Sequence, residues 1–417
     1  MLEDISETWK TRILPWLSYF KPLRDMLSTA KDVYGDLLGV DFDDSVLLSF
    51  QLKGLLGTLR FVQAGIVGLS HGVIADDTIT DVPVFVKAVK KMLEEAKIQT
   101  KNAVIALPGS KVAIKKIKLE AKLSEEAAEA RAWQEAQKTF PELVKSLLLD
   151  FVQIETLSSD NIKNWTLVLI VARKEDVLPR VDILKQAGLT TKIADVDYFS
   201  LERAYTLFAS QLPEKHEEKY LALIDFNPHS ILFVVMHQKS MRYYSRQSYA
   251  GDALVPIVRR IMGVEVRATQ TEKTAASPVE TSAQANPSAP LKMETEKTLP
   301  FPSPLAVETQ TVAQSQVGLL TEDQKSHIVM TIRRLFQSFY TENPGHIIEC
   351  VAMTGRCALI PEVTQYVEKM LDISLTIPNP LLALKNLESK NRESIVKLGP
   401  AFTLCCGIAM RGMPLWK

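Results

Sequence analysis

Two aspartates occupy equivalent places in two hairpin patterns, an arrangement typical of sites that hold phosphate. The stretch "LLGVDFDDSVLLSFQL" (37–52) predicts a strand, a short polar turn and a second strand, with Asp41 near the turn. The pattern recurs in "YLALIDFNPHSILFVVMH" (220–237), about 180 residues later, where Asp225 takes the same place. In nucleotide-binding proteins such turns usually carry glycine, which lets the backbone approach phosphate, and a lysine that supplies charge. The candidate chemistry is therefore phosphate binding, altered in its details.

Composition limits the other chemistries. The 417 residues include 49 basic and 49 acidic ones, so no overall field attracts nucleic acid or an anionic membrane. The longest apolar runs have the length of a strand, far short of a bilayer span, and the acidic N-terminus does not resemble a secretory signal. The four cysteines form no CxxC pair and have no histidine cluster beside them, so we expect no metal site. We expect the cysteines to be buried and reduced, in a cytosolic protein.

Hydrophobic periodicity predicts the elements that must position the aspartates. A helix begins near Pro83, and a second one is capped by Ser124 and reaches about Lys138. A helix at 174–186 ends at Gly188, and the capping box Thr321–Gln324 begins another. Strands are predicted at 103–107, 112–119, 147–155, 166–172 and 346–353, with a helix from Pro361, a short strand near 373–377 and a final helix near 400–411.

These motifs together resemble the PilM family of type IV pilus assembly proteins, actin-like relatives of FtsA. The resemblance rests on the two hairpins, on "NAVIALPGSKVAIKKIKL", "KLSEEAAEARAWQEAQKTFP", "VLIVARKEDVLPRVDILKQAGLTTKIADVDYFSLERAY" and "AMTGRCALIPEV", and on "GPAFTLCCGIAMR" near the end. It implies an α/β, actin-like (RNase H-like) fold of two lobes with an FtsA-like α+β insert subdomain. In that fold two phosphate hairpins and an adenosine loop, here "TGRCALIP", close over a nucleotide.

The resemblance divides the chain into eight segments. They are a leader (1–36), the start of the first lobe (37–75), the insert (76–180), the rest of the first lobe (181–215), the start of the second lobe (216–266), a Pro/Thr/Ser-rich insertion (267–316), the rest of the second lobe (317–394) and a C-terminal helix returning to the first lobe (395–417). Residues 267–316 contain six prolines, no glycine and one aromatic residue, so we expect disorder there. It would act as a spacer or, less simply, as a regulated docking segment.

The residues that could still touch a nucleotide are Asp41, Ser45, Asp225 and Gly355. The family pattern places glycine where this chain has Asp43 in the first hairpin, Asn227 in the second and Arg356 in the adenosine loop, and lysine where it has Leu48. Asp and Asn tolerate positive φ, so both turns are expected to persist without glycine.

Phosphate binding is expected to suffer from these replacements. A carboxylate about 4 Å from a phosphate charge costs roughly 4 kcal/mol at an effective dielectric near 20. Magnesium held by Asp41 and Asp225, or a contribution from Arg356, would recover part of this; otherwise the two aspartates serve only as turn caps. We therefore expect no cofactor beyond weak Mg·ATP binding, and no hydrolysis.

The predicted function is that of a non-enzymatic scaffold, cytoplasmic and peripheral to the bacterial inner membrane. The resemblance implies binding of the cytoplasmic N-terminus of the bitopic partner PilN, through the first lobe and its insert, with oligomerisation open. One alternative is an ATP-binding actin-like module of a type II secretion platform. The other is a sugar- or acetate-kinase-type phosphotransferase, which would need glycine-rich phosphate loops.

The leader contains "WKTRILPWLSYFKPLRDML" (9–27). Leu14, Pro15 and Trp16 resemble the motif expected at the start of a PilN-type partner, so this segment is a candidate mimic that competes for the partner's site. Pro15 and Pro22 disfavour one continuous helix. The alternative is an amphipathic segment that lies on the membrane or on the protein's own core.

Overall fold

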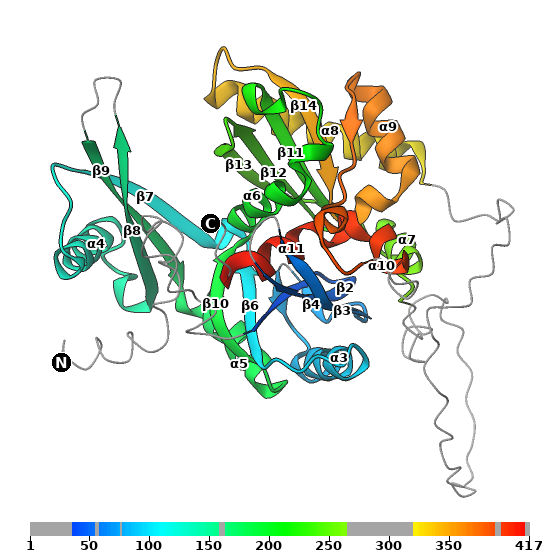
Figure 1. Ribbon diagram of the computed structural model, residues 1–417, viewed down its shortest axis with the longest axis horizontal. Helices are drawn as coiled ribbons and strands as arrows, with labels where there is room; N and C mark the ends of the chain where they lie inside the picture. Colours follow the sequence, from blue (N-terminus) through cyan, green and yellow to red (C-terminus); the bar gives the residue numbers. More distant parts are fainter. Residues whose placement is uncertain are drawn as a thin grey trace, which may run out of the picture.

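The computed structural model describes residues 36–54, 58–75, 77–157, 163–264, 320–387 and 393–412. They form two lobes, one above the other in Figure 1, and an insert that projects to the left of them. The predicted disordered stretch 267–316 and the leader up to residue 35 lie outside the described residues. None of the helices in the described ranges combines the length and apolar character needed to cross a membrane.

The first lobe is built on a five-stranded sheet with the strand order β10-β6-β1-β2-β3. Its strands are β1 (Leu37–Phe42), β2 (Val46–Lys53), β3 (Arg60–Gly68), β6 (Asn102–Leu107) and β10 (Thr190–Val196), with the small hairpin β4 (Ile74–Ala75) and β5 (Thr78–Ile79) nearby. Its helices are α3 (Val82–Glu95), α5 (Lys174–Gln186) and α6 (Asp197–Phe208). β1 pairs antiparallel with β2 and parallel with β6, so the first hairpin lies at the middle of the sheet.

The second lobe repeats this plan, with the strand order β13-β12-β11-β14-β15. Its elements are β11 (Tyr220–Asn227), β12 (Ser230–His237), β13 (Ser240–Ser248), β14 (Ile348–Thr354), β15 (Leu375–Thr376), α7 (Leu254–Ile261), α8 (Glu322–Glu342) and α9 (Pro361–Leu371). β11 pairs antiparallel with β12 and parallel with β14, as β1 does with its neighbours. The two predicted hairpins are thus equivalent strands of two similar sheets.

The insert has its own three-stranded sheet, of order β7-β9-β8. Its elements are β7 (Val112–Leu119), α4 (Glu125–Thr139), β8 (Leu147–Leu157) and β9 (Lys163–Arg173). Ala128, Ala132 and Phe151 belong to a small core between α4 and one face of this sheet. The predicted unit 76–180 is too wide, because β6 lies within the first-lobe sheet and α3 packs into the core of that lobe. Hydrophobic periodicity predicts helices and strands, but strand pairing decides to which domain each of them belongs.

Short C-terminal helices join the lobes. α10 (Glu393–Lys397) precedes α11 (Thr403–Ala409), which lies between the two lobes in Figure 1. Leu404 and Ile408 enter one hydrophobic core, whereas Cys405 and Cys406 enter the other, and each core contains strands of both sheets. At Gly407 an added Cβ would lie 1.9 Å from the carbonyl oxygen of Ser200, so only glycine permits this contact between α11 and α6. The lobes therefore share continuous apolar packing.

Several local predictions are confirmed in detail. Ser124 caps α4, and Thr321 forms the expected capping box with Gln324 at α8. Gly188 has a φ of +89° after α5, the conformation expected of a helix-ending glycine. The four cysteines are buried and free of disulfides.

Candidate functional site

The first hairpin turn is closed by the side chain of Asp43. Its Oδ1 accepts hydrogen bonds from the backbone N–H of Ser45 (2.8 Å), from the Ser45 hydroxyl (2.5 Å) and from the N–H of Val46 (2.9 Å). Neither Asp43 nor Asn227 has a positive φ, so the expectation that they replace glycine through this conformation is wrong. Asp43 instead stabilises the turn by accepting three hydrogen bonds. Ser45 was expected to donate to phosphate, but its hydroxyl donates to Asp43.

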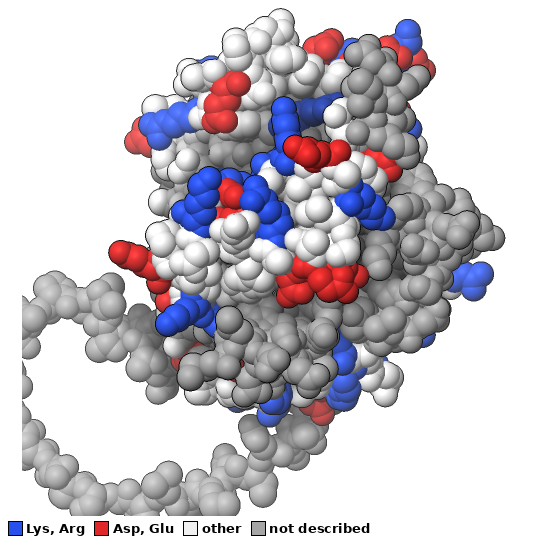
Figure 2. Space-filling view, turned by 90° about the vertical axis from the view of Figure 1, so that its left-hand side faces the viewer, with Lys and Arg blue, Asp and Glu red and all other residues white. Residues whose placement is uncertain are grey.

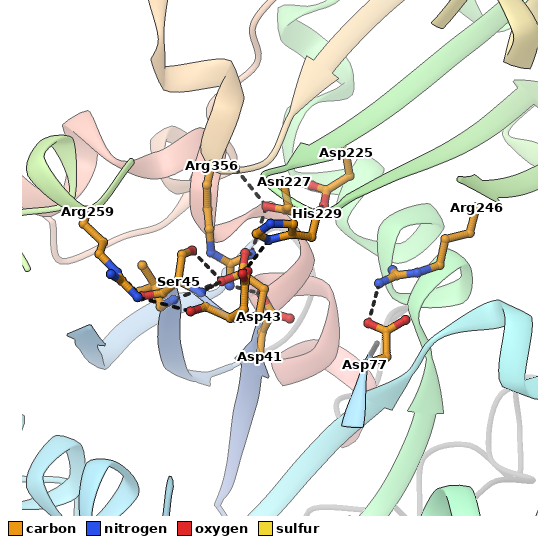
Figure 3. A network of polar contacts seen from close by, with 12 residues as sticks. Asp41, Asp43, Ser45, Asp77, Asp225, Asn227, His229, Arg246, Arg259 and Arg356 are labelled. Carbon is orange, nitrogen blue, oxygen red and sulfur yellow. Dashed lines mark hydrogen bonds and ion pairs between the residues drawn. The ribbon is translucent and has the colours of Figure 1, made fainter. Parts of the chain in front are cut away.

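Arg356 brings the two lobes together. It follows β14 in the second lobe, and its side chain is buried, with 2% exposed. Its Nη2 donates to Asp41 at 2.9 Å, and its Nη1 lies 3.2 Å from a carboxylate oxygen of Asp43 and donates to Asn227 at 2.9 Å. Figure 3 shows the guanidinium between both hairpins. We call Asp41, Asp43, Asn227 and Arg356 the interlobe cluster.

Opposite charges face each other within this cluster. Burial would lower the pKa of Arg356, but the carboxylates of Asp43 and Asp41 raise it overall, so the guanidinium stays charged. Burial raises the pKa of Asp41, and the neighbouring Arg356 opposes this rise. One arginine thus faces two carboxylates at a site shielded from solvent, where ion pairs are strongest.

Asp225 lies beside the cluster, on β11. Its two carboxylate oxygens accept hydrogen bonds from the Thr354 hydroxyl (2.9 Å) and from the Asn227 side-chain amide (2.7 Å). Burial raises the pKa of Asp225 to about 6, although the bond from Thr354 works in the other direction. Each oxygen of this carboxylate is engaged with a neighbour on the second lobe.

Gly355 is required by packing. Its φ is +88°, and an added Cβ would lie 2.5 Å from the carbonyl oxygen of Phe226. Its N–H donates to the carbonyl of Pro400 at 2.9 Å. This glycine lets the loop after β14 pass directly over the end of β11, and so places Arg356 between the hairpins.

Three more second-lobe side chains reach the first lobe (Figure 3). His229 Nδ1 lies 2.5 Å from a carboxylate oxygen of Asp44, and its Nε2 lies 2.9 Å from Asp252, which also belongs to the second lobe. The hydrogen bond to Asp44 chiefly raises the pKa of His229, to about 9, so the ring is charged at neutral pH.

The other two are arginines. Arg246 on β13 forms ion pairs with Asp197 and Asp77, both at 2.9 Å. Arg259 on α7 donates to the backbone carbonyls of Ser45, Asp44 and Leu69. Polar contacts between the lobes, made by these three side chains, therefore flank the interlobe cluster.

The sequence prediction located part of this site. Asp41, Asp225 and Gly355 lie close together, as expected. Arg356 was noted as a replaced glycine and as a possible aid to phosphate binding, and its ion pairs were not foreseen. His229, Arg246 and Arg259 were missed, since nothing local marks them. The candidate leader residues Leu14, Pro15 and Trp16 lie outside the described residues. Within the described ranges, no group of three or more His, Cys, Asp or Glu side chains is arranged to hold a metal ion.

The chain matches the family described as type IV pilus assembly protein PilM over residues 39–286 and 315–413. It belongs to the PilM family. The resemblance inferred from the sequence motifs is thereby confirmed. These residues include both hairpins, the insert and α11, so the PilM family assignment rests on the whole architecture.

Comparison with solved structures concerns the fold. A structure titled "PilM-PilN type IV pilus biogenesis complex" is 18% identical, with a TM-score of 0.62, covering 90% of this chain and 98% of its own. The ethanolamine utilization protein EutJ from Carboxydothermus hydrogenoformans is 9% identical, with a TM-score of 0.42 and coverages of 90% and 89%. A Bacteroides thetaiotaomicron protein with an actin-like ATPase fold is 8% identical, with a TM-score of 0.36 and coverages of 88% and 97%. The predicted actin-like fold is confirmed.

Proposed function

We propose that this protein is a non-enzymatic scaffold of type IV pilus assembly. It works at the cytoplasmic face of the bacterial inner membrane and holds the cytoplasmic N-terminus of a PilN-type bitopic protein. Membership of the PilM family supports the pilus role over a type II secretion module or a small-molecule kinase. The similarity to a structure titled as a PilM–PilN complex supports the partner.

The interlobe cluster carries the non-enzymatic part of this proposal. A nucleotide between the two hairpins needs donors that are free to meet its phosphates. Here the Arg356 guanidinium is bound to Asp41, Asp43 and Asn227. Drawing Arg356 towards a phosphate would leave buried carboxylates unpaired, which typically costs about 3–5 kcal/mol. That cost is about half of the roughly 8 kcal/mol that a micromolar site supplies.

Mg·ATP also fits the remaining carboxylates poorly. Asp41 is bound to Arg356, Asp43 closes its own turn, and both oxygens of Asp225 accept hydrogen bonds. A magnesium ion would have to break these bonds before it gained a ligand, and hard cations need several oxygen ligands. The site is better suited to hold the lobes together than to bind a metal-bound phosphate.

A rigid body suits a scaffold. Two hydrophobic cores run through both lobes, and ion pairs from His229 and Arg246 also join the lobes. Figure 2 shows Lys and Arg interspersed with Asp and Glu on the face seen from the left of Figure 1. Partner recognition is therefore expected to depend on apolar side chains with a few specific polar pairs, rather than on a charged patch.

Calorimetry with Mg·ATP tests the first half of the proposal. We expect no binding tighter than about 100 μM, which corresponds to roughly 5.5 kcal/mol. The double variant Asp43→Gly/Arg356→Gly, which restores two of the three glycines of the family pattern, is the matched comparison. Low-micromolar affinity in the natural chain would contradict the account of Arg356 given above.

Titration with a peptide of the cognate PilN N-terminus tests the second half. We expect saturable binding with a Kd in the micromolar range, as for a short segment that becomes ordered when it binds. A peptide of the same composition in scrambled order is the control. If the folded protein bound neither peptide, the proposed partner would be wrong, whatever the result with ATP.

A further inference from the structure

The insert sheet has two faces with different neighbours. Side chains alternate along β8, so Leu149 and Phe151 belong to the core beneath α4. Leu148 belongs to the large core of the first lobe instead. Asp150 therefore lies on the same face as Leu148, opposite α4. We call this the free face.

Asp150 is the unusual residue of the free face. One carboxylate oxygen accepts a hydrogen bond from the N–H of Phe151 at 2.8 Å. The other, Oδ2, is buried and has no hydrogen-bond partner among the residues that the structure describes. Burial raises the pKa of Asp150 to about 7, against the lowering effects of the hydrogen bond from Phe151 and of the charge of Arg411, which itself lies 3.5 Å from Asp195. A buried carboxylate without a partner is costly, so a donor is expected to approach it.

Apolar side chains continue the free face beyond Asp150. Val152 lies opposite Val168 in the register of β8 and β9, so the two side chains share the face. Both are buried, at 7% and 6% exposed, yet neither belongs to the hydrophobic cores formed by the described residues. An occupant of this face needs a cation for Asp150 and apolar area for the two valines.

The leader of this chain has that chemistry. "TRILPWL" places Arg12 two residues before Leu14 and four before Trp16. Pro15 disfavours helical backbone at Leu14, and in an extended segment residues two apart lie on one side. Arg12, Leu14 and Trp16 would then form a single side, a guanidinium followed by two apolar groups. An indole buries large area, and Arg is the cation best suited to a carboxylate.

Chain length permits this placement. About 20 residues separate Trp16 from Leu37, enough for an extended reach of up to roughly 66 Å. Leu37 and Leu148 belong to the same hydrophobic core, so the described chain begins in the core that the insert also joins.

We propose that the leader docks on the free face, with Arg12 paired to Asp150 and Trp16 covering Val152 and Val168. The insert then carries its own intramolecular ligand. The proposal does not depend on the proposed partner, because it concerns only contacts within one chain.

Limited proteolysis of the full chain tests it, by measuring the rate of chymotryptic cleavage after Trp16. Asp150→Asn and Arg12→Gln are each expected to speed cleavage about tenfold. A hydrogen bond between charged groups contributes about 1.5–3 kcal/mol, and 1.4 kcal/mol is a factor of ten in the open population. The double variant should be no faster than either single variant, since both remove one pair. Arg24→Gln is the matched control and should stay within about twofold.

Unchanged cleavage in both single variants would overturn the proposal. So would a result in which Asp150→Asn leaves cleavage unchanged but weakens binding of the PilN peptide, because the free face would then belong to the partner. The cooperative thermal transition of each variant shows that the folded body is intact. If Asp150→Asn fails to fold, Arg12→Gln decides alone.

Discussion

The interlobe cluster and the free face of the insert both bury a carboxylate, but among the described residues only the first supplies a hydrogen-bonded cation for it. Asp41 meets Arg356 at 2.9 Å, whereas Oδ2 of Asp150 meets no hydrogen-bond donor. Burial raises the pKa of both groups, and in Asp41 the adjacent guanidinium opposes the rise.

The difference separates a structural site from a binding site. Where buried charges are already paired within the fold, an incoming ligand must first break those ion pairs and hydrogen bonds. Where a buried charge is unmatched, an incoming cation gains a partner without breaking one. The region that resembles a ligand site by family is thus the poorer candidate, and the insert is the better one.

The largest effect is expected from Arg356→Ala. It leaves Asp41 and Asp43 buried without their cation, so the free energy of unfolding should fall by about 3–5 kcal/mol. Urea denaturation at pH 7 measures it. Arg260→Ala on the exposed side of α7 is the control and should change stability by less than about 0.5 kcal/mol. A loss below about 1 kcal/mol at Arg356 would mean that the cluster does not hold the lobes.

A smaller effect of opposite sign is expected from Asp150→Asn in a chain that also carries Arg12→Ala. The carboxylate is then unpaired, so its removal should stabilise by about 1–3 kcal/mol. Burial raises the pKa of Asp150 in the folded state to about 7. The carboxylate therefore begins to destabilise the fold as the pH rises above the ordinary pKa of an aspartate, and the destabilisation is complete above pH 7. The gain should therefore be larger at pH 8 than at pH 5. Asp182→Asn, at an exposed position, should show neither the gain nor the pH dependence.

The smallest effect is expected from His229→Gln. A raised pKa means that the ion pair with Asp44 stabilises fully below about pH 6.5 and is lost as the pH rises through about 9. The side chain is about a third exposed, so we expect a difference below about 1 kcal/mol at pH 6, vanishing near pH 10. Denaturation at both pH values measures it, with His71→Gln as the exposed control. A difference that persists at pH 10 would argue for packing rather than charge.

Local chemistry made much of the fold predictable. The cap at Ser124, the capping box at Thr321 and the glycine after α5 act within a few residues, so the sequence displays them directly. The sequence prediction wrongly assigned β6 to the insert, because its place in the first lobe depends on parallel pairing with β1, some 65 residues away. The same limit applied to the site, since Arg356 lies 315 residues from Asp41.

The sequence by itself determined the two matching hairpins, the loss of glycine and lysine from them, and membership of a family. Those features depend on residue type and short spacing. Only the tertiary structure decided what replaced the missing groups. Gly355 lets β14 and β11 come close enough to place Arg356 between two aspartates. The alternation of β8 places Asp150 on a face where the described residues give its Oδ2 no hydrogen-bond donor. Electrostatic pairing acts over a few ångströms in space, and distance along the chain does not reveal it.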